Sequence, residues 1–73
     1  MNTRIETAIE HWKFVAPLLT PPDNDEDYRM LVDALDTILD AGGSDEANPL
    51  AALAVMMGTV VAKYEAINYP MPA

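Results

Sequence analysis

Three carboxylates, Asp23, Asp25 and Asp27, alternate along the chain, which is the spacing that opens a calcium-binding loop. An EF-hand loop that starts at Asp23 needs glycine at its sixth position and glutamate at its twelfth. These positions hold Tyr28 and Ala34. We therefore predict no metal site here, and we interpret the acidic residues as caps of a following helix, where the helix dipole favours negative charge.

Catalytic chemistry finds equally little support in the residue types. The chain has a single histidine, His11, and no cysteine. Catalysis needs several convergent groups held in one pocket, and His11 has no patterned partner along the sequence. We expect a non-enzymatic protein with no catalytic residue and no cofactor.

The remaining acidic residues follow one face of a helix that we predict from about residue 25 to residue 41. Its start can be capped by Asp23 with Glu26 or by Asn24 with Asp27, and it should end at the pair of glycines at 42–43. Apolar side chains recur at helical spacing on one face, namely Tyr28, Leu31, Val32, Leu35, Ile38 and Leu39. The opposite face carries Arg29, Asp33, Asp36 and Asp40.

A first helix is predicted from about residue 3 to residue 16. Thr3 and Glu6 have the spacing of a capping box, and Pro17 should end the helix because it lacks an N–H group. Leu18 and Leu19 then continue as a loose turn that fills the core. One stripe of this helix is apolar and consists of Ile5, Ala8, Ile9, Trp12, Val15 and Ala16.

A third helix is predicted from about residue 49 to residue 67, with Asn48 as its cap and Pro49 in its first turn. Its core stripe consists of Leu50, Leu53, Ala54, Met57, Val60, Val61 and Tyr64. The other side is small and uncharged instead of polar, so we expect something outside this chain to cover it. The predicted dimer interface is Ala51, Val55, Met56, Gly58, Thr59 and Ala62.

These elements predict an all-α three-helix bundle, in which the second and third helices form an antiparallel hairpin and the first packs across it. We expect one domain over residues 1–68, followed at 69–73 by the start of a linker. A domain of 73 residues is marginal alone. Without cysteine for a disulfide or ligands for a structural metal, oligomerisation is the available remedy.

The net charge of the chain and the length of its uncharged run limit the kinds of molecule that it can bind. Four basic residues against 12 acidic ones give a net charge of −8, which repels phosphate backbones and argues against direct nucleic-acid binding. The same charge attracts a basic protein. The uncharged run at 48–62 is shorter than the roughly 20 residues that cross a bilayer, so we expect a cytoplasmic protein with no membrane segment.

Four short motifs, taken in order, resemble the amino-terminal helical region of HigA-type antitoxins. They are Val15-Ala16-Pro17-Leu18-Leu19, Asp27-Tyr28 leading into Leu35 and Leu39, Asn48-Pro49-Leu50 with Leu53, and Lys63-Tyr64-Glu65 with Tyr69-Pro70. The resemblance covers nearly the whole of this chain but only about half of such an antitoxin. It implies a helical region that dimerises and engages a toxin, followed in the parent family by a helix-turn-helix domain that binds operator DNA.

The toxin implied by this resemblance is a small basic mRNA interferase of the HigB type, and Asp33, Asp36 and Asp40 are the candidate contacts to it. The sequence ends at Ala73, before any helix-turn-helix begins, so transcriptional autoregulation is expected only of a longer protein. The alternative interpretation is a dimerisation domain of a transcriptional regulator that has no toxin partner.

Overall fold

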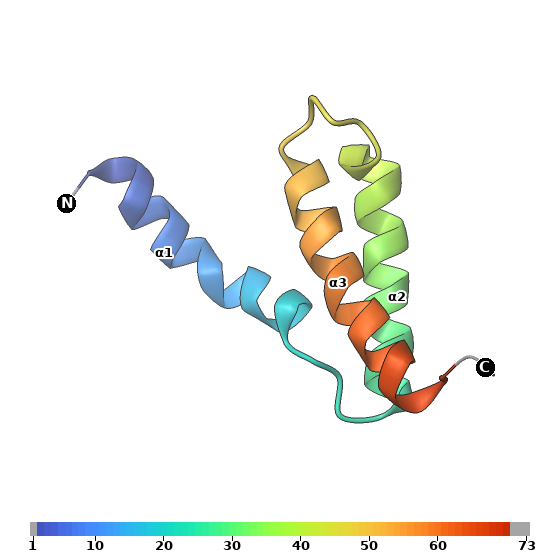
Figure 1. The fold of residues 1–73 in the computed structure, drawn as a ribbon. Helices are drawn as coiled ribbons and strands as arrows, with labels where there is room; N and C mark the ends of the chain where they lie inside the picture. Colours follow the sequence, from blue (N-terminus) through green and yellow to red (C-terminus); the bar gives the residue numbers. More distant parts are fainter. Residues whose placement is uncertain (1, 71–73) are drawn as a thin grey trace.

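The computed structural model describes residues 2–70 and contains three α-helices in that range (Figure 1). They are α1 (Thr3–Val15), α2 (Asp25–Ile38) and α3 (Leu50–Asn68). A short 3₁₀-helix, η1 (Ala16–Leu19), continues α1, and a π-helical turn, η2 (Leu39–Gly43), continues α2. The described residues contain no β-strand. The predicted all-α architecture with three helices is confirmed.

α2 and α3 lie side by side and run in opposite directions, as the predicted hairpin requires (Figure 1). Leu31 of α2 meets Met57 and Val61 of α3 in the centre of the core, and Met57 is fully buried. Around this centre lie half-buried side chains from both predicted apolar stripes, which are Tyr28, Val32, Leu35, Ile38, Leu53 and Val60. Both stripes therefore face each other as the sequence predicts.

The ends of the hairpin helices are set by short polar contacts. The side chain of Asn24 accepts the backbone N–H of Asp27 at 2.9 Å, so Asn24 caps α2. At the other end Gly42 has a φ of +135°, a conformation that side-chain-bearing residues rarely adopt. The side chain of Asn48 accepts the N–H of Leu50 at 2.9 Å. α3 thus begins one residue later than predicted: Pro49, which was predicted in its first turn, precedes the first helical residue, and Asn48 supplies the predicted side-chain acceptor.

The start of α1 differs from the prediction. Asn2 is the cap, and its side-chain oxygen accepts the N–H of Ile5 at 3.1 Å. Thr3 already lies inside the helix, where its carbonyl accepts the hydroxyl of Thr7 at 2.9 Å. The predicted capping box of Thr3 with Glu6 is therefore wrong, because the residue before Thr3 offers an equally good acceptor.

The position of α1 also differs from the expectation that it packs across the hairpin. None of its residues is buried, and it projects from the hairpin as an arm (Figure 1). The contact with α3 is made by η1, whose Leu18 and Leu19 pack against the core as predicted. The Cα radius of gyration is 14.1 Å, whereas a compact domain of this length has about 11 Å. The single chain is therefore extended.

Candidate protein-interaction site

The outward side of α3 exposes most of the residues predicted for a dimer interface. Val55 is 70% exposed, and Thr59 and Ala62 are exposed beside it. Ala51 and Gly58 are half-buried at the edge of the same side. This surface, which we call the α3 outer face, is not covered by any other element among residues 2–70.

Gly58 is the most informative residue of the α3 outer face. A Cβ atom built on Gly58 meets no other atom within 4 Å. Its own chain therefore does not require glycine at this position, although glycine weakens a helix interior by roughly 0.5–1 kcal/mol relative to alanine. Glycine at this position would, however, allow the backbone of a second helix to approach α3 closely.

Met56 lies apart from the other predicted interface residues. Residues that are two positions apart in an α-helix are separated by about 200° around its axis, so Met56 and Gly58 point in nearly opposite directions. Met56 shares its side of α3 with Ile67, which is 70% exposed. One partner helix along the α3 outer face would not cover Met56.

The second exposed apolar surface follows α1. Ile5, Ile9 and Trp12 each have half or more of their surface exposed, and Ile9 reaches 60%. They were expected to face the core, so their exposure is a consequence of the arm position of α1. Phe14 is exposed on the other side of the helix, with the ammonium of Lys13 5.2 Å from its ring centroid.

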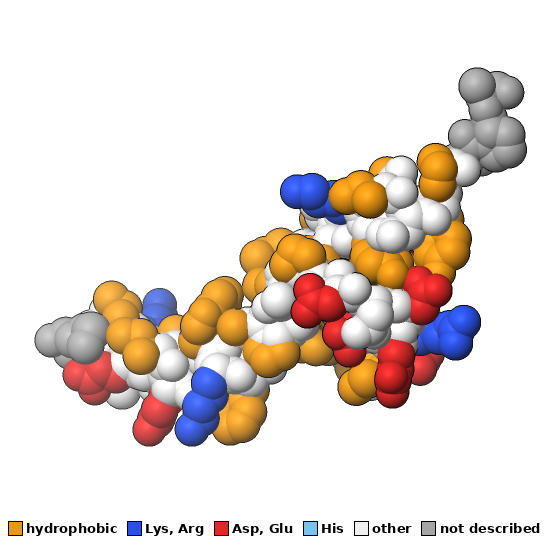
Figure 2. Space-filling model, turned by 90° about the horizontal axis from the view of Figure 1, so that it is seen from below, with side chains coloured by type: hydrophobic (Ala, Val, Ile, Leu, Met, Phe, Trp, Pro, Cys, Tyr) orange, Lys and Arg blue, Asp and Glu red, His pale blue; other side chains and the backbone are white. Residues whose placement is uncertain are grey.

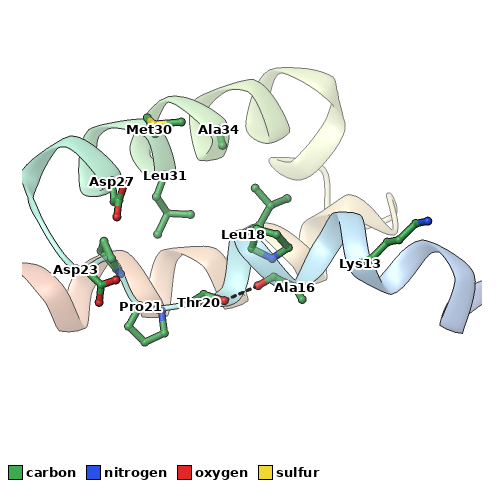
Figure 3. Close-up of a pocket in the computed structure, with 12 residues that line it drawn as sticks. Lys13, Ala16, Leu18, Thr20, Pro21, Asp23, Asp27, Met30, Leu31 and Ala34 are labelled. Carbon is green, nitrogen blue, oxygen red and sulfur yellow. Dashed lines mark hydrogen bonds between the residues drawn. The ribbon is translucent and has the colours of Figure 1, made fainter.

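A groove of about 620 Å³ lies between η1 and α2 (Figure 3). Leu18 and Leu31 line it from the core, and Met30, which is 65% exposed, lies at its rim. Lys13 lies toward one end of the groove, and the carboxylates of Asp23 and Asp27 lie toward the other. The sequence motifs gave no indication of this groove, because it depends on how the chain turns between the consecutive elements η1 and α2.

The three acidic residues predicted as toxin contacts are all exposed, and they lie on the side of the hairpin opposite the core stripe; they are Asp33, Asp36 and Asp40. The structure places them on one face at helical spacing. The three carboxylates form a solvent-exposed row of negative charge. Such a row is typical of a solvated helix face and is also the kind of surface that binds a basic protein.

Asp25 belongs to a tyrosine cluster that the sequence analysis missed. Its carboxylate accepts the hydroxyl of Tyr64 at 2.7 Å and that of Tyr69 at 2.5 Å. Tyr28 stacks on Tyr64 with ring centroids 4.8 Å apart and donates its hydroxyl to Glu65 at 2.6 Å. The cluster joins the first turn of α2 to the end of α3.

The same hydrogen bonds shift the acid–base equilibria of this cluster. The hydroxyls of Tyr69 and Tyr64 lower the pKa of Asp25 below its ordinary 3.8. The bond to Asp25 in turn raises the pKa of Tyr64 from 10.0 to about 12. These hydrogen bonds connect α2 to the end of α3, so the cluster holds the two helices of the hairpin together.

Within residues 2–70, no three histidine, cysteine, aspartate or glutamate side chains lie close enough together to hold a metal ion. The alternating carboxylates of the sequence do not converge on one point: Asp25 bonds to tyrosines, whereas Asp23 and Asp27 line the groove. The described residues instead present exposed apolar side chains on α1 and α3 and a row of exposed carboxylates on α2 and η2.

Comparisons of the chain with family models, curated proteins and solved structures gave no match. The size of the exposed surface indicates what the chain lacks as a single molecule. The whole chain exposes 5704 Å², whereas a folded monomer of 8.0 kDa exposes about 4,500 Å². The difference exceeds the roughly 800 Å² that each partner buries in an interface of standard size.

Proposed function

We propose that this chain is a non-enzymatic protein–protein interaction module that forms a homodimer. The observation that carries the proposal is the set of large apolar side chains left exposed on α1 and α3, in a chain whose total exposed surface is larger than that of a compact monomer of its mass. A second copy is the simplest partner, because it brings the same uncovered surface to the contact and closes the assembly by two-fold symmetry.

The oligomeric state tests this proposal directly. Light scattering at tens of micromolar should give twice the 8.0 kDa mass of the chain. A monomer at that concentration with ordinary thermal stability would contradict the proposal. Gly58→Glu tests the α3 outer face specifically, since it buries a charge in the predicted contact. Ala47→Glu adds the same charge in the exposed hairpin loop and is the matched control.

We further propose that the dimer binds a small basic protein, in the manner that the resemblance to HigA-type antitoxins implies for a HigB-type mRNA interferase. The net charge of −8 and the exposed row of Asp33, Asp36 and Asp40 support this proposal. Charge complementarity of this kind raises the association rate and weakens as salt increases. Blocking the basic residues of such a toxin would neutralise it.

Capture of the small basic protein encoded beside this chain, or rescue of cells that express it, would test toxin binding. Changing all three row residues to asparagine should weaken capture and reduce its dependence on salt. Asp45→Asn with Glu46→Gln removes charge from the hairpin loop instead and should have little effect. A basic neighbour that neither binds nor is neutralised would favour the alternative, a regulator's dimerisation domain without a toxin.

We propose a cytoplasmic location for this module. By length and composition alone α3 is able to cross a membrane, and it is the only helix among the described residues with this property. The core helix of a soluble protein has the same character, and one side of α3 packs against α2. Its last turns also carry Lys63 and Glu65. Flotation with phosphatidylcholine vesicles should leave the protein in the soluble fraction.

A further inference from the structure

The exposed stripe of α1 has a spacing that reads the same in both directions. Ile5, Ile9, Trp12 and Ala16 are separated by four, three and four residues, which keeps them on one side of a helix. In an antiparallel pair of identical helices, Ile5 of one copy lies opposite Ala16 of the other, and Ile9 lies opposite Trp12. The stripe is therefore complementary to itself, as a two-fold contact requires.

Charged residues beside the stripe fit the same arrangement. Glu6 and Lys13 border one edge of it, next to Ile9. Antiparallel pairing brings Glu6 of one copy within about two residues of Lys13 of the other along the helix, and this occurs twice by symmetry. Opposite charges would then flank an apolar seam.

The stripe also leads into the groove beside η1. Ala16 and Lys13 belong to both surfaces, and hydrophobic side chains follow the arm from its free end to the body of the molecule (Figure 2). A second α1 laid antiparallel along the first brings its own first turn beside η1, with its N-terminus directed toward the far end of the groove. Asp23 and Asp27 lie toward that end (Figure 3), where carboxylates favour a helix N-terminus.

We propose that α1 is a dimerisation arm: two copies pair their α1 helices antiparallel along Ile5, Ile9, Trp12 and Ala16, and the tip of each arm covers the partner's groove. This inference rests on the proposed homodimer but not on the α3 outer face. In this arrangement a second copy covers the apolar stripe of α1 and also fills the groove. It also explains why a 13-residue helix with no buried residue carries three large apolar side chains, Ile5, Ile9 and Trp12, on one stripe.

Ile9→Asp tests the seam by placing a charge at its centre. It should weaken self-association at least about tenfold, measured by analytical ultracentrifugation over a concentration series. Thr7→Asp introduces the same charge on the opposite side of α1 and should leave the dissociation constant unchanged. Equal dissociation constants for Ile9→Asp and the unmodified chain would overturn the arm pairing.

Cross-linking tests the register, because the natural chain has no cysteine. Ile5→Cys and Met30→Cys are made in separate chains, which are mixed and mildly oxidised. A disulfide-linked heterodimer is expected, since Ile5 of one copy lies beside the groove of the other. Thr7→Cys mixed with Met30→Cys should not cross-link. Failure of the first pair, or equal cross-linking of both pairs, would refute the tip-in-groove contact.

The outcomes separate this inference from the proposed function. If the unmodified chain is a monomer, both the proposed homodimer and the arm pairing are refuted. A dimer that Gly58→Glu dissociates but Ile9→Asp leaves intact would keep the proposed homodimer and remove the arm. A dimer that only Ile9→Asp dissociates would confirm the arm and leave the α3 outer face to another partner.

Discussion

Substituting Gly58 by alanine should have opposite effects on the single chain and on the dimer. In the single chain a Cβ atom at Gly58 meets nothing within 4 Å, and the residue lies in the interior of α3. Replacing glycine by alanine in such a helix adds about 0.5–1 kcal/mol of stability. For a domain of this size, that gain corresponds to an increase of roughly 2–8 °C in Tm.

In a dimer that packs on the α3 outer face, the same methyl group enters a close contact between two helices. Overpacking of this kind costs about 1–3 kcal/mol, which exceeds the gain in helix propensity. The gain in helix propensity is common to the folded monomer and the dimer, so overpacking alone should raise the dissociation constant of the dimer, by about tenfold if it costs 1.4 kcal/mol. The sign of the effect thus depends on whether a partner is bound.

Thermal melts followed by circular dichroism, well below and well above the dissociation constant, distinguish these two effects. We expect Gly58→Ala to raise Tm in the dilute sample and to lower it, or raise it less, in the concentrated one. Gly43→Ala is the control, because its Cβ would lie 2.8 Å from the carbonyl oxygen of Ile38 and should destabilise both samples. An equal increase in Tm at both concentrations would show that no partner contacts Gly58.

Three further predictions concern the core, the tyrosine cluster and the arm. Met57→Ala should lower the free energy of unfolding by about 2–5 kcal/mol, because Met57 is 0% exposed; urea denaturation measures this, and a smaller loss would mean that the core collapses into the cavity. Tyr64 has its pKa raised from 10.0 to about 12, so the stability it contributes is complete below pH 10 and is lost as the pH rises toward 12. Asp25 has a lowered pKa, so its contribution is present above pH 3.8 and is lost as the pH falls further; Asp25→Asn should flatten both limbs of a plot of Tm against pH. Dilution to the monomer should remove the helical signal of α1, which supplies 13 α-helical residues against 14 in α2 and 19 in α3, because an isolated helix of that length is marginal in water; ellipticity at 222 nm that is independent of concentration would contradict this.

The hairpin was predictable from the sequence because each of its signals has a local cause. The amphipathic pattern of α2 fixes which side meets the core, and Gly42 provides the positive φ at which the π-helical turn η2, which continues α2 beyond Ile38, leaves helical geometry. The cap at Asn48 then sets where α3 begins. All of these depend on residues within a few positions of each other.

The position of α1 was not predictable in the same way. A helical stripe such as Ile5, Ile9 and Trp12 shows which side of a helix is apolar, but it carries no information about what covers that side. The direction of the arm is set by η1, whose Leu18 and Leu19 are held on the core. The first helix was therefore assigned correctly, whereas its packing was not.

The tyrosine cluster escaped the sequence analysis because its contacts join residues that are far apart in the chain. Asp25 was interpreted as a helix-capping residue, and Tyr28 and Tyr64 as ordinary members of the two core stripes. The sequence does contain one indication of the cluster, because each of the two core stripes has a tyrosine toward the same end of the predicted hairpin. Tyr69 was assigned to a linker, yet its hydroxyl also reaches Asp25; residues 71–73 of that predicted linker lie outside the described residues.

The distribution of aromatic residues gives this protein two separate intrinsic fluorophores. Its single tryptophan, Trp12, lies on the arm, whereas all three of its tyrosines lie in the hairpin cluster. Emission excited at the red edge of the absorption band therefore reports the polarity around α1 alone, and tyrosine emission reports the hairpin. Covering of the arm and melting of the hairpin can thus be followed in one unlabelled sample as two independent optical signals.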